Sequence, residues 1–447
     1  MPVDQSPTAL ERLIREGSEA DLRRFLLLLQ PQEIADIIEV LESAEDRARA
    51  FRAIVGQKRS SVLRDIEEGE GRDELIEALE PAETARLVTE MKSDDAADLL
   101  LDLDEEEKAE VLRHVPEADR EELERLTEYS EDSAGGLMQT ELVKVRSDQT
   151  VRAAVEEIRR TRDEVGELHE IFVVDPEGRL KGWVKERALI LAEDDDRIGT
   201  ITRPVPQSVP ITMDQEDIAD LVRDYDLSSV PVIDEDERLL GRILVDDIVD
   251  VVMEEATEDI TRLGGTDPEE IYEPSIRQAL RSRTPWLVIA FFGTVTASLV
   301  IAAAEGVIHN AGSLLAFLPV IMGMGGGSST QAATVTVRSL ALGRIRPGQV
   351  WAVVRKEALT GFLVAIGTGA VLWVVVTLTR QGEPATALIA ALSVFGTISI
   401  GTTLGVIVPL VLEKLGADPA VATSPFVTTM NDVLGATVII VTGLMVL

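Results

Sequence analysis

An aspartate inside an apolar segment is the residue with the clearest chemical meaning in this sequence. Asp432 is the only charged residue between Val421 and Leu447. An ionisable side chain near the middle of a bilayer costs about 2.5–3.5 kcal/mol on insertion scales, so it marks a functional position. Thr428–Asp432 offers side-chain and carbonyl oxygens within little more than one helical turn. We therefore predict an ion site at Asp432 and Asn431; the alternative is a carboxylate hydrogen-bonded to a neighbouring helix.

The composition limits which metals such a site could take. The chain has no cysteine and three widely spaced histidines, His114, His169 and His309. This excludes thiolate chemistry and disulfides and disfavours the usual nitrogen-based zinc site. Oxygen ligands remain, and they suit hard cations such as Mg²⁺, Ca²⁺ or Mn²⁺.

Five long apolar runs predict a membrane domain, because a helix needs about 20 apolar residues to cross the hydrocarbon core. The runs are Trp286–Ala304, Leu314–Val337, Leu359–Thr379, Ala385–Leu412 and Val421–Leu447. Basic residues gather before the first run, between the second and third, and at Lys414 between the fourth and fifth. This bias places these loops and the N-terminal part in the cytoplasm. Since five is odd, the C-terminus is expected outside.

Glycine and hydroxyl residues crowd the second run. After Pro319, the segment Gly323–Gln331 contains four glycines. Either the helix breaks there and turns backbone carbonyls toward a cavity, or the glycines allow neighbouring helices to approach closely. In the fourth run, Gly401–Gly405 is typical of close helix packing.

Residues 1–277 form a strongly acidic part of the chain. They contain 74 acidic and 34 basic residues, a net charge of −40, whereas the remainder is slightly basic. Such a surface excludes general nucleic-acid binding, which needs basic residues, and disfavours attraction to anionic lipid. The N-terminus shows no signal peptide. We therefore expect the acidic part to stay in the cytoplasm.

Two kinds of element are expected within the acidic part. Residues 10–128 have helical periodicity, and Pro31 and Pro81 each start a new helix, which favours a compact superhelix. Further on, a strand–turn–strand pattern occurs twice, 59 residues apart, with Gly182 aligned on Gly241. The expected strands are Ile171–Val174, Leu180–Val184, Val230–Ile233 and Leu239–Val245, and the expected preceding helices are Val151–Arg160 and Gln215–Asp224. The pattern resembles a tandem CBS pair, a small α/β sensor module.

Several motifs together resemble the MgtE family of magnesium transporters over nearly the whole chain. They are Ser93–Leu100, Glu131–Met138, Val245–Asp250 with Glu254–Asp259, Pro319–Gln331 and Pro425–Asp432. The resemblance implies a homodimeric, Mg²⁺-selective, channel-like transporter in the cell membrane. It makes Asp432 the pore aspartate and places Asp418 near the cytoplasmic mouth. The Mg²⁺-sensing carboxylates that it implies are Asp95, Asp214, Glu216, Asp226, Asp247, Asp250, Glu255, Glu258 and Asp259.

The expected fold class is therefore a multidomain membrane protein. It has an α-helical, superhelical N domain, a tandem α/β CBS pair, a long connecting "plug" helix and an all-α transmembrane domain of five helices. The expected boundaries are 1–130 for the N domain, 131–199 and 200–253 for the CBS repeats, 254–280 for the connecting helix and 281–447 for the transmembrane domain.

The chain departs from the family pattern at two positions near expected ion sites. Gly327 stands where the family usually has asparagine, which removes a polar side chain near the pore. Lys92 stands where the N-domain motif often has aspartate, which weakens one sensing site.

A further departure concerns adenine nucleotides. CBS modules that bind them often end the second strand with Ser or Thr and have Asp three residues later. The first repeat has Lys185 and Ala188 there, and the second has Leu244 and Asp247. This pattern argues against ATP binding.

Three readings compete for the function. The first is a Mg²⁺ channel or transporter that closes when Mg²⁺ bridges its acidic cytoplasmic surfaces. The second changes the ion to Mn²⁺, Co²⁺ or Ca²⁺, because oxygen ligands alone do not separate these ions. The third is a membrane-anchored nucleotide sensor without transport, against which Asp432 argues. No catalytic set of residues points to an enzyme.

Overall fold

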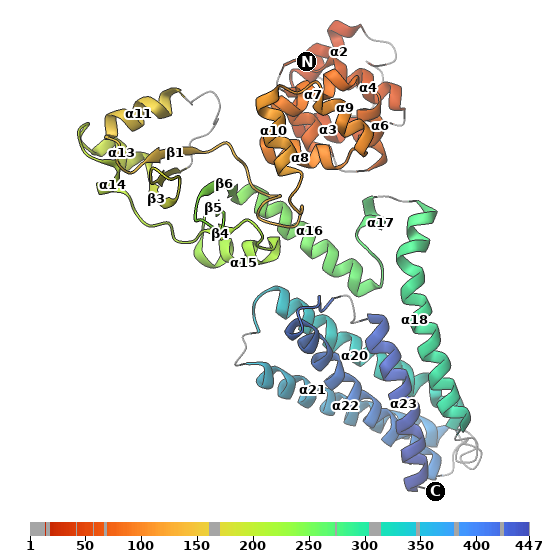
Figure 1. The fold of residues 1–447 in the computed structure, drawn as a ribbon. Helices are drawn as coiled ribbons and strands as arrows, with labels where there is room; N and C mark the ends of the chain where they lie inside the picture. Colours follow the sequence, from red (N-terminus) through yellow and green to blue (C-terminus); the bar gives the residue numbers. More distant parts are fainter. Residues whose placement is uncertain are drawn as a thin grey trace. The chain divides into compact units, whose positions relative to one another are not determined.

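The computed structural model describes residues 14, 18–41, 43–56, 58–66, 69–160, 170–272, 275–303, 314–345, 349–379, 384–420 and 424–446. These residues belong to two compact units, Met1–Glu254 and Glu255–Leu447 (Figure 1). We describe each unit by itself. His169, His309 and the loop residue Gly382 lie outside the described residues.

Short helices form the N-terminal part of the first unit. They are α2 Glu19–Leu26, α3 Pro31–Val40, α4 Ala44–Ala53, α5 Lys58–Asp65, α6 Glu70–Glu77, α7 Pro81–Glu90, α8 Ser93–Leu101, α9 Glu105–Leu112 and α10 Glu117–Leu126. Pro31 and Pro81 occupy the first turns of α3 and α7, as the sequence predicts. Proline is tolerated there because its missing N–H would have no helical partner. The buried faces of these helices share one hydrophobic core.

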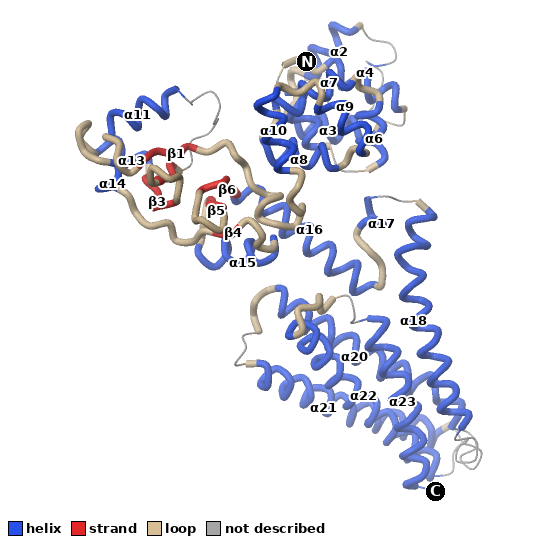
Figure 2. The backbone as a smooth tube through the Cα atoms, viewed as in Figure 1, coloured by secondary structure: helices blue, strands red, loops and turns tan. Residues whose placement is uncertain are grey.

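Two three-stranded sheets follow, shown in red in Figure 2. The first repeat contains β1 Val143–Arg146, α11 Val151–Arg160, β2 Ile171–Val174, β3 Leu180–Val184 and α13 Glu186–Leu191. The second contains α14 Ile198–Ile201, β4 Val209–Pro210, α15 Gln215–Tyr225, β5 Ser229–Ile233 and β6 Leu239–Leu244. In both sheets the first two strands are parallel and the last two antiparallel. The strand and helix positions predicted from the sequence are confirmed to within a residue or two.

The hairpin turns of the two repeats contact each other symmetrically. The Leu180 N–H donates to the Glu237 carbonyl, and the Leu239 N–H donates to the Gly178 carbonyl. Gly178 and Glu237 occupy equivalent turn positions, and both have positive φ. The internal repeat seen in the sequence is therefore also a structural repeat.

The N-terminal helices and the second repeat share part of a core. Ala97 of α8 and Leu126 of α10 pack with Val230 and Val232 of β5. In addition, the Ser93 hydroxyl donates to Glu141 at 2.9 Å and accepts from the Thr140 N–H at 2.8 Å. These contacts bring the start of α8 to the second repeat.

The connecting helix is shorter than predicted. α16 spans Val245–Gly264, so it begins directly after β6 and ends well before residue 280. Gly265, with φ of 77°, follows its last residue, and a left-handed glycine there is a common way to end a helix. A short helix, α17 Glu269–Tyr272, precedes α18 Ile276–Ala303, to which residues 276–280 belong. The prediction of one connecting helix over 254–280 is therefore wrong in its extent.

The second unit contains long helices. They are α18 Ile276–Ala303, α20 Leu318–Ala341, which follows the 3₁₀ turn η1 Leu314–Phe317, α21 Val350–Leu378, α22 Pro384–Lys414 and α23 Ser424–Val446. α22 packs against α20, α21 and α23, whereas α18 packs mainly against α23 (Figure 1). Among the described residues, α18, α21, α22 and α23 are long and apolar enough to cross a membrane.

The remaining expected span, the second apolar run Leu314–Val337, corresponds to α20, which is not among these four helices. Its glycine, serine and threonine residues distinguish it from the other long helices. α20 continues unbroken through Gly323–Gln331, so the expectation of a broken helix is wrong. The alternative, close helix packing, holds at Gly325, where an added Cβ would meet Thr397 of α22 and Asn431 of α23, but not at Gly323 or Gly327, where nothing lies within 4 Å.

Candidate ion sites in the membrane helices and the acidic part

Asp432 lies on α23, the last long helix, and its side chain is half-buried. Within the described part of the chain, no hydrogen-bond donor or basic side chain pairs with its carboxylate. The alternative reading of Asp432 as a carboxylate bonded to a neighbouring helix therefore finds no partner there. An unpaired carboxylate on an otherwise apolar helix is suited to receive a cation.

Asn431 has a different environment from its neighbour. Its side chain is only 1% exposed, and neither amide atom has a hydrogen-bond partner among the described residues. It lies where α23 meets Gly325 of α20 and Gly401 of α22, because a Cβ at either glycine would collide with the Asn431 side chain. The structure thus places Asn431 in a junction of three helices. The sequence analysis did not distinguish this position from that of Asp432.

An apolar groove of about 600 Å³ runs along the α22–α23 face. It is lined by Ile400, Leu404, Phe426, Thr429, Met430, Val433 and Leu434. Five of these residues recur on one face of α23 and two on one face of α22. The groove therefore offers a surface to lipid or to another helix rather than to an ion.

The glycine junction gives a stability prediction. Gly325→Ala should lower the thermal stability of the purified protein markedly, since the new methyl group would meet Thr397 and Asn431. Overpacking of this kind typically costs 1–3 kcal/mol. Gly327→Ala is the matched control in the same helix, because nothing lies within 4 Å of its added Cβ. Equal melting temperatures for the two variants in detergent would contradict this packing.

A second cluster lies at the end of α16, within the second unit. Glu258 and Asp418 both form ion pairs with Arg262, and Asp259 lies 3.9 Å from Arg338 of α20. Burial, followed by the charge of Asp418, raises the pKa of Asp259 to about 6. The nearby charge of Glu255 acts in the same direction. The structure thus brings together three carboxylates that the sequence analysis assigned to ion sensing, Glu255, Glu258 and Asp259, and Asp418, which it assigned to the cytoplasmic mouth.

Neither Arg262 nor Arg338 is part of the predicted site. Arg262 stands four residues after Glu258, a spacing at which oppositely charged side chains meet on a helix. That spacing could have indicated the intrahelical ion pair. The pairing with Asp418 depends on tertiary structure and has no local signal.

A third cluster lies in the first unit, at the start of α8. Asp94 is 6% exposed, and one of its carboxylate oxygens has no partner among the described residues. Burial and the charge of Asp94 raise the pKa of Asp95 to about 7 and that of Asp247 to about 7. The Gln139 amide and the Leu244 N–H, each at 3.2 Å, donate to Asp247. Asp94, outside the predicted set, thus belongs with Asp95 and Asp247.

Lys92, one of the departures from the family pattern, immediately precedes α8. Its positive charge lowers the pKa of Asp95 and of Asp247, although burial and the charge of Asp94 outweigh it. The lysine therefore partly offsets the repulsion within this cluster.

The remaining predicted carboxylates are separate from these clusters or serve locally. Asp214 caps α15 by accepting from the Glu216 N–H at 3.0 Å. Asp226 ends α15 with φ of 52°, and Asp250 lies exposed on α16. Among the described residues, no group of three Asp, Glu or His side chains is arranged to hold a metal ion.

The raised pKa values give a pH prediction. An aspartate ionises near pH 4 when unfolded, whereas Asp95 and Asp247 ionise near pH 7 in the fold. The unfolded state therefore loses these protons first, and folding becomes less favourable as pH rises from about 4 to about 7. In thermal unfolding with EDTA, Asp95→Asn with Asp247→Asn should flatten this decline. A decline equally steep in the double variant would contradict the cluster.

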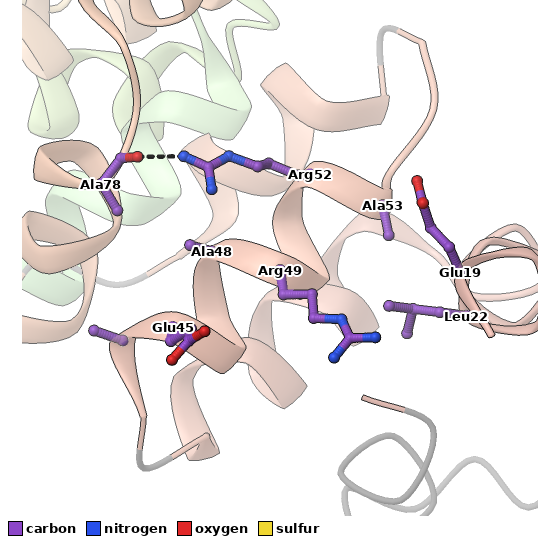
Figure 3. A pocket seen from close by; sticks show the side chains of 9 residues that line it. Glu19, Leu22, Glu45, Ala48, Arg49, Arg52, Ala53 and Ala78 are labelled. Carbon is purple, nitrogen blue, oxygen red and sulfur yellow. Dashed lines mark hydrogen bonds between the residues drawn. The ribbon is translucent and has the colours of Figure 1, made fainter. Parts of the chain in front are cut away.

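A further pocket, of about 540 Å³, lies in the N-terminal helices (Figure 3). It is lined by Glu19, Leu22, Ala44, Glu45, Ala48, Arg49, Arg52, Ala53 and Ala78. Arg52 is held by the Ala78 carbonyl (Figure 3). Because its charged residues are of both signs, this pocket lacks the character of a divalent-cation site, and we assign it no role.

The residues at the CBS positions that were compared with nucleotide-binding modules make local contacts. The Lys185 ammonium lies 4.9 Å from the ring centroid of Trp183. Ala188 packs against the core of the first repeat. Asp247 is engaged by Gln139 and Leu244, as described above.

Apolar helices with an unpaired aspartate, preceded by a helical domain and a CBS pair, define a class of membrane transport protein. Residues 318–442 match the MgtE family model, described as a divalent cation transporter. Residues 29–132 match the MgtE intracellular N domain, and residues 134–195 and 198–254 match the CBS domain. The chain belongs to the MgtE family of divalent cation transporters.

Curated relatives agree with this assignment. The magnesium transporter MgtE of Enterococcus faecalis is 36% identical over 70% of this chain and 68% of its own length. That of Thermus thermophilus is also 36% identical, over 71% of this chain and 70% of its own. The MgtE of Bacillus subtilis is 29% identical over 94% of this chain and 93% of its own.

Solved structures resemble the first unit. The cytosolic domain of the Mg²⁺ channel MgtE in complex with ATP is 33% identical, with a TM-score of 0.52, and covers 55% of this chain and all of that one. The soluble part of a magnesium transporter is 32% identical, with a TM-score of 0.50, and covers 56% of this chain and 98% of that one.

Proposed function

We propose that this chain is a Mg²⁺-selective, channel-like transporter. The observation that carries the proposal is Asp432, a half-buried carboxylate on an apolar helix without a partner among the described residues. Placing a carboxylate in the membrane costs free energy, and its presence there therefore indicates a function. The curated relatives are named as magnesium transporters, which favours Mg²⁺ as the ion.

The chemistry of Mg²⁺ fits one carboxylate per chain. Mg²⁺ binds oxygens at about 2.1 Å and gives up its waters reluctantly. Asp432 from each of two subunits could hold a hydrated ion through its water shell. The site would then select ions by the size of the hydrated ion. This criterion separates Mg²⁺ from the larger Ca²⁺ better than from Mn²⁺ or Co²⁺.

The pore is proposed to form between two copies in the cell membrane. Asp432 is only half-buried within one chain, and most side chains of α18 are exposed, which leaves surface for lipid and for a second subunit. We place the first unit in the cytoplasm and the C-terminus outside, following the positive charges. A cysteine introduced at Gly382 and labelled only from the cytoplasm would overturn this topology.

Regulation is assigned to the acidic residues. We propose that cytoplasmic Mg²⁺ closes the pore by bridging carboxylates. The proposed ligands are Asp95, Asp214, Glu216, Asp226, Asp247, Asp250, Glu255, Glu258, Asp259 and Asp418. The crowded carboxylates support this role. Burial and, after it, the charge of a neighbouring aspartate raise the pKa of Asp95, Asp247 and Asp259, and a divalent cation would relieve the repulsion between them.

ATP is not included in the proposed mechanism. One relative's cytosolic domain was solved with ATP, whereas this chain has Lys185 and Ala188 in the first repeat. Calorimetric titration of ATP into the purified protein would test whether this chain differs from that relative. Tight binding would contradict the exclusion of ATP from the proposed mechanism.

Ion uptake into proteoliposomes is the test of the proposed function. Mg²⁺ uptake should exceed that of empty liposomes, and competition by Co²⁺, Mn²⁺ and Ca²⁺ would rank selectivity. Preferred uptake of another cation would change the ion but keep the class. No uptake of any cation would favour the alternative of a membrane-anchored sensor.

A further inference from the structure

Arg262, near the end of α16, bridges two carboxylates from distant parts of the chain. Its Nη1 atom forms ion pairs with Glu258, one helical turn earlier, and with Asp418, 156 residues later between α22 and α23. The other Asp418 oxygen accepts from the Ala420 N–H at 2.7 Å, which fixes the carboxylate. One guanidinium thus links the connecting helix to the segment that leads into α23.

The same turns of α16 are held at a second point. Asp259 lies 3.9 Å from Arg338, near the end of α20. Between these anchors, Thr261 is only 8% exposed. Two arginines therefore anchor the last turns of α16 within the second unit.

The chain's own cations already occupy part of the proposed regulatory site. Glu258, Asp259 and Asp418 are proposed to bind the regulatory ion, yet the first and last of them share Arg262. An arginine stays protonated at any physiological pH, so its charge cannot be removed by titration. A divalent ion that bridges Glu258 and Asp418 has to displace the Arg262 guanidinium.

We propose that Arg262 is a tethered cation that docks the connecting helix when no divalent ion is bound and competes with the ion for Glu258 and Asp418. The inference rests on the proposed function, whose regulatory site it refines. Because the arginine is covalently attached, its local concentration is constant. Arg262 therefore sets the Mg²⁺ concentration at which the site fills and keeps some channels closed below it.

The accessibility of Thr261 tests this role directly in the full-length protein. The chain has no cysteine, so Thr261→Cys introduces a single thiol that is protected when α16 is docked. In EDTA, adding Arg262→Gln should raise the rate of maleimide labelling about three- to tenfold, the effect of losing a partly exposed ion pair. Excess Mg²⁺ should return the rate to the parental value.

Two further variants control the experiment. Arg262→Lys keeps the charge but not the forked geometry and should give an intermediate rate. Arg277→Gln removes an exposed arginine of α18 and should leave the rate unchanged. An Arg262→Gln rate equal to the parental rate in EDTA would overturn the proposal.

Mg²⁺ flux is a second measurement, and it distinguishes this proposal from the proposed function on which it rests. Without the Thr261 substitution, Arg262→Gln should raise Mg²⁺ flux at low cytoplasmic Mg²⁺. Lower or unchanged flux would overturn the role of Arg262 as a docking cation. If the intact protein ignores cytoplasmic Mg²⁺, the proposed gate fails, while thiol labelling still reports whether Arg262 holds α16.

Discussion

Replacing Asp432 by alanine is expected to abolish Mg²⁺ flux while leaving a folded protein. The Asp432 carboxylate is the one acidic group on the described part of α23. Among the described residues, no hydrogen-bond donor or basic side chain pairs with it. Without it, a hydrated ion loses the one carboxylate of α23 that would replace the stabilisation lost from bulk water. Uptake into proteoliposomes should fall to the level of empty liposomes.

Folding has to be checked independently of flux. Size-exclusion chromatography and melting in detergent should show the Asp432→Ala variant unchanged or slightly stabilised, because an unpaired, half-buried charge has been removed. Thr437→Ala is a suitable control on the same helix, since Thr437 is exposed and its hydroxyl bonds only to the Val433 carbonyl. Undiminished flux in Asp432→Ala would refute the pore assignment.

The second large effect is expected from neutralising the acidic sensor. The variant combines Asp247→Asn, Asp250→Asn, Glu258→Gln and Asp259→Asn. Its flux should persist at millimolar cytoplasmic Mg²⁺, where the intact protein closes. Like charges repel within a Debye length of about 8 Å, and bridging ions reverse that repulsion only in the compact state. To shift the ratio of closed to open channels from 1:99 to 99:1, the sites together need to supply about 5.5 kcal/mol of binding free energy.

A control must separate loss of ligands from loss of charge. Converting Glu90, Glu121, Glu128 and Glu156 to glutamine removes the same charge from exposed positions and should leave closure intact. Deleting residues 1–130 should act like the sensor variant, since it removes Asp94 and Asp95. If the intact protein conducts equally at low and high cytoplasmic Mg²⁺, the gating proposal fails.

Much of the fold follows from local sequence patterns. The CBS strands agree with prediction because short apolar runs and turn signals repeat at a fixed spacing. The helix starts at Pro31 and Pro81 follow from proline geometry. The end of α16 differs from the prediction, although Gly264, Gly265 and Pro268 mark a stop, because acidic and apolar residues continue beyond them.

The candidate site was predictable in its residue types but not in its pairing. Asp432 stands out because a charge in an apolar run is rare in itself. The burial of Asn431 depends on which face of α23 meets α20 and α22. The local sequence of α23 does not predict which face that is. Likewise, the contact of Arg262 with Asp418 joins residues far apart in the chain, so only the folded unit reveals it.

The glycine junction around Asn431 has a consequence for dynamics. Most helices touch through side chains, whose rotamer changes let the helices slide past one another. Where the small residues Gly325 and Gly401 bring backbones against Asn431, that freedom is removed. We therefore expect α20, α22 and α23 to move as one rigid body, with the amides of the junction among the slowest to exchange with deuterium. The movement that opens and closes the proposed pore would then occur in α16 and at the proposed contact between subunits, while α20, α22 and α23 keep their mutual arrangement.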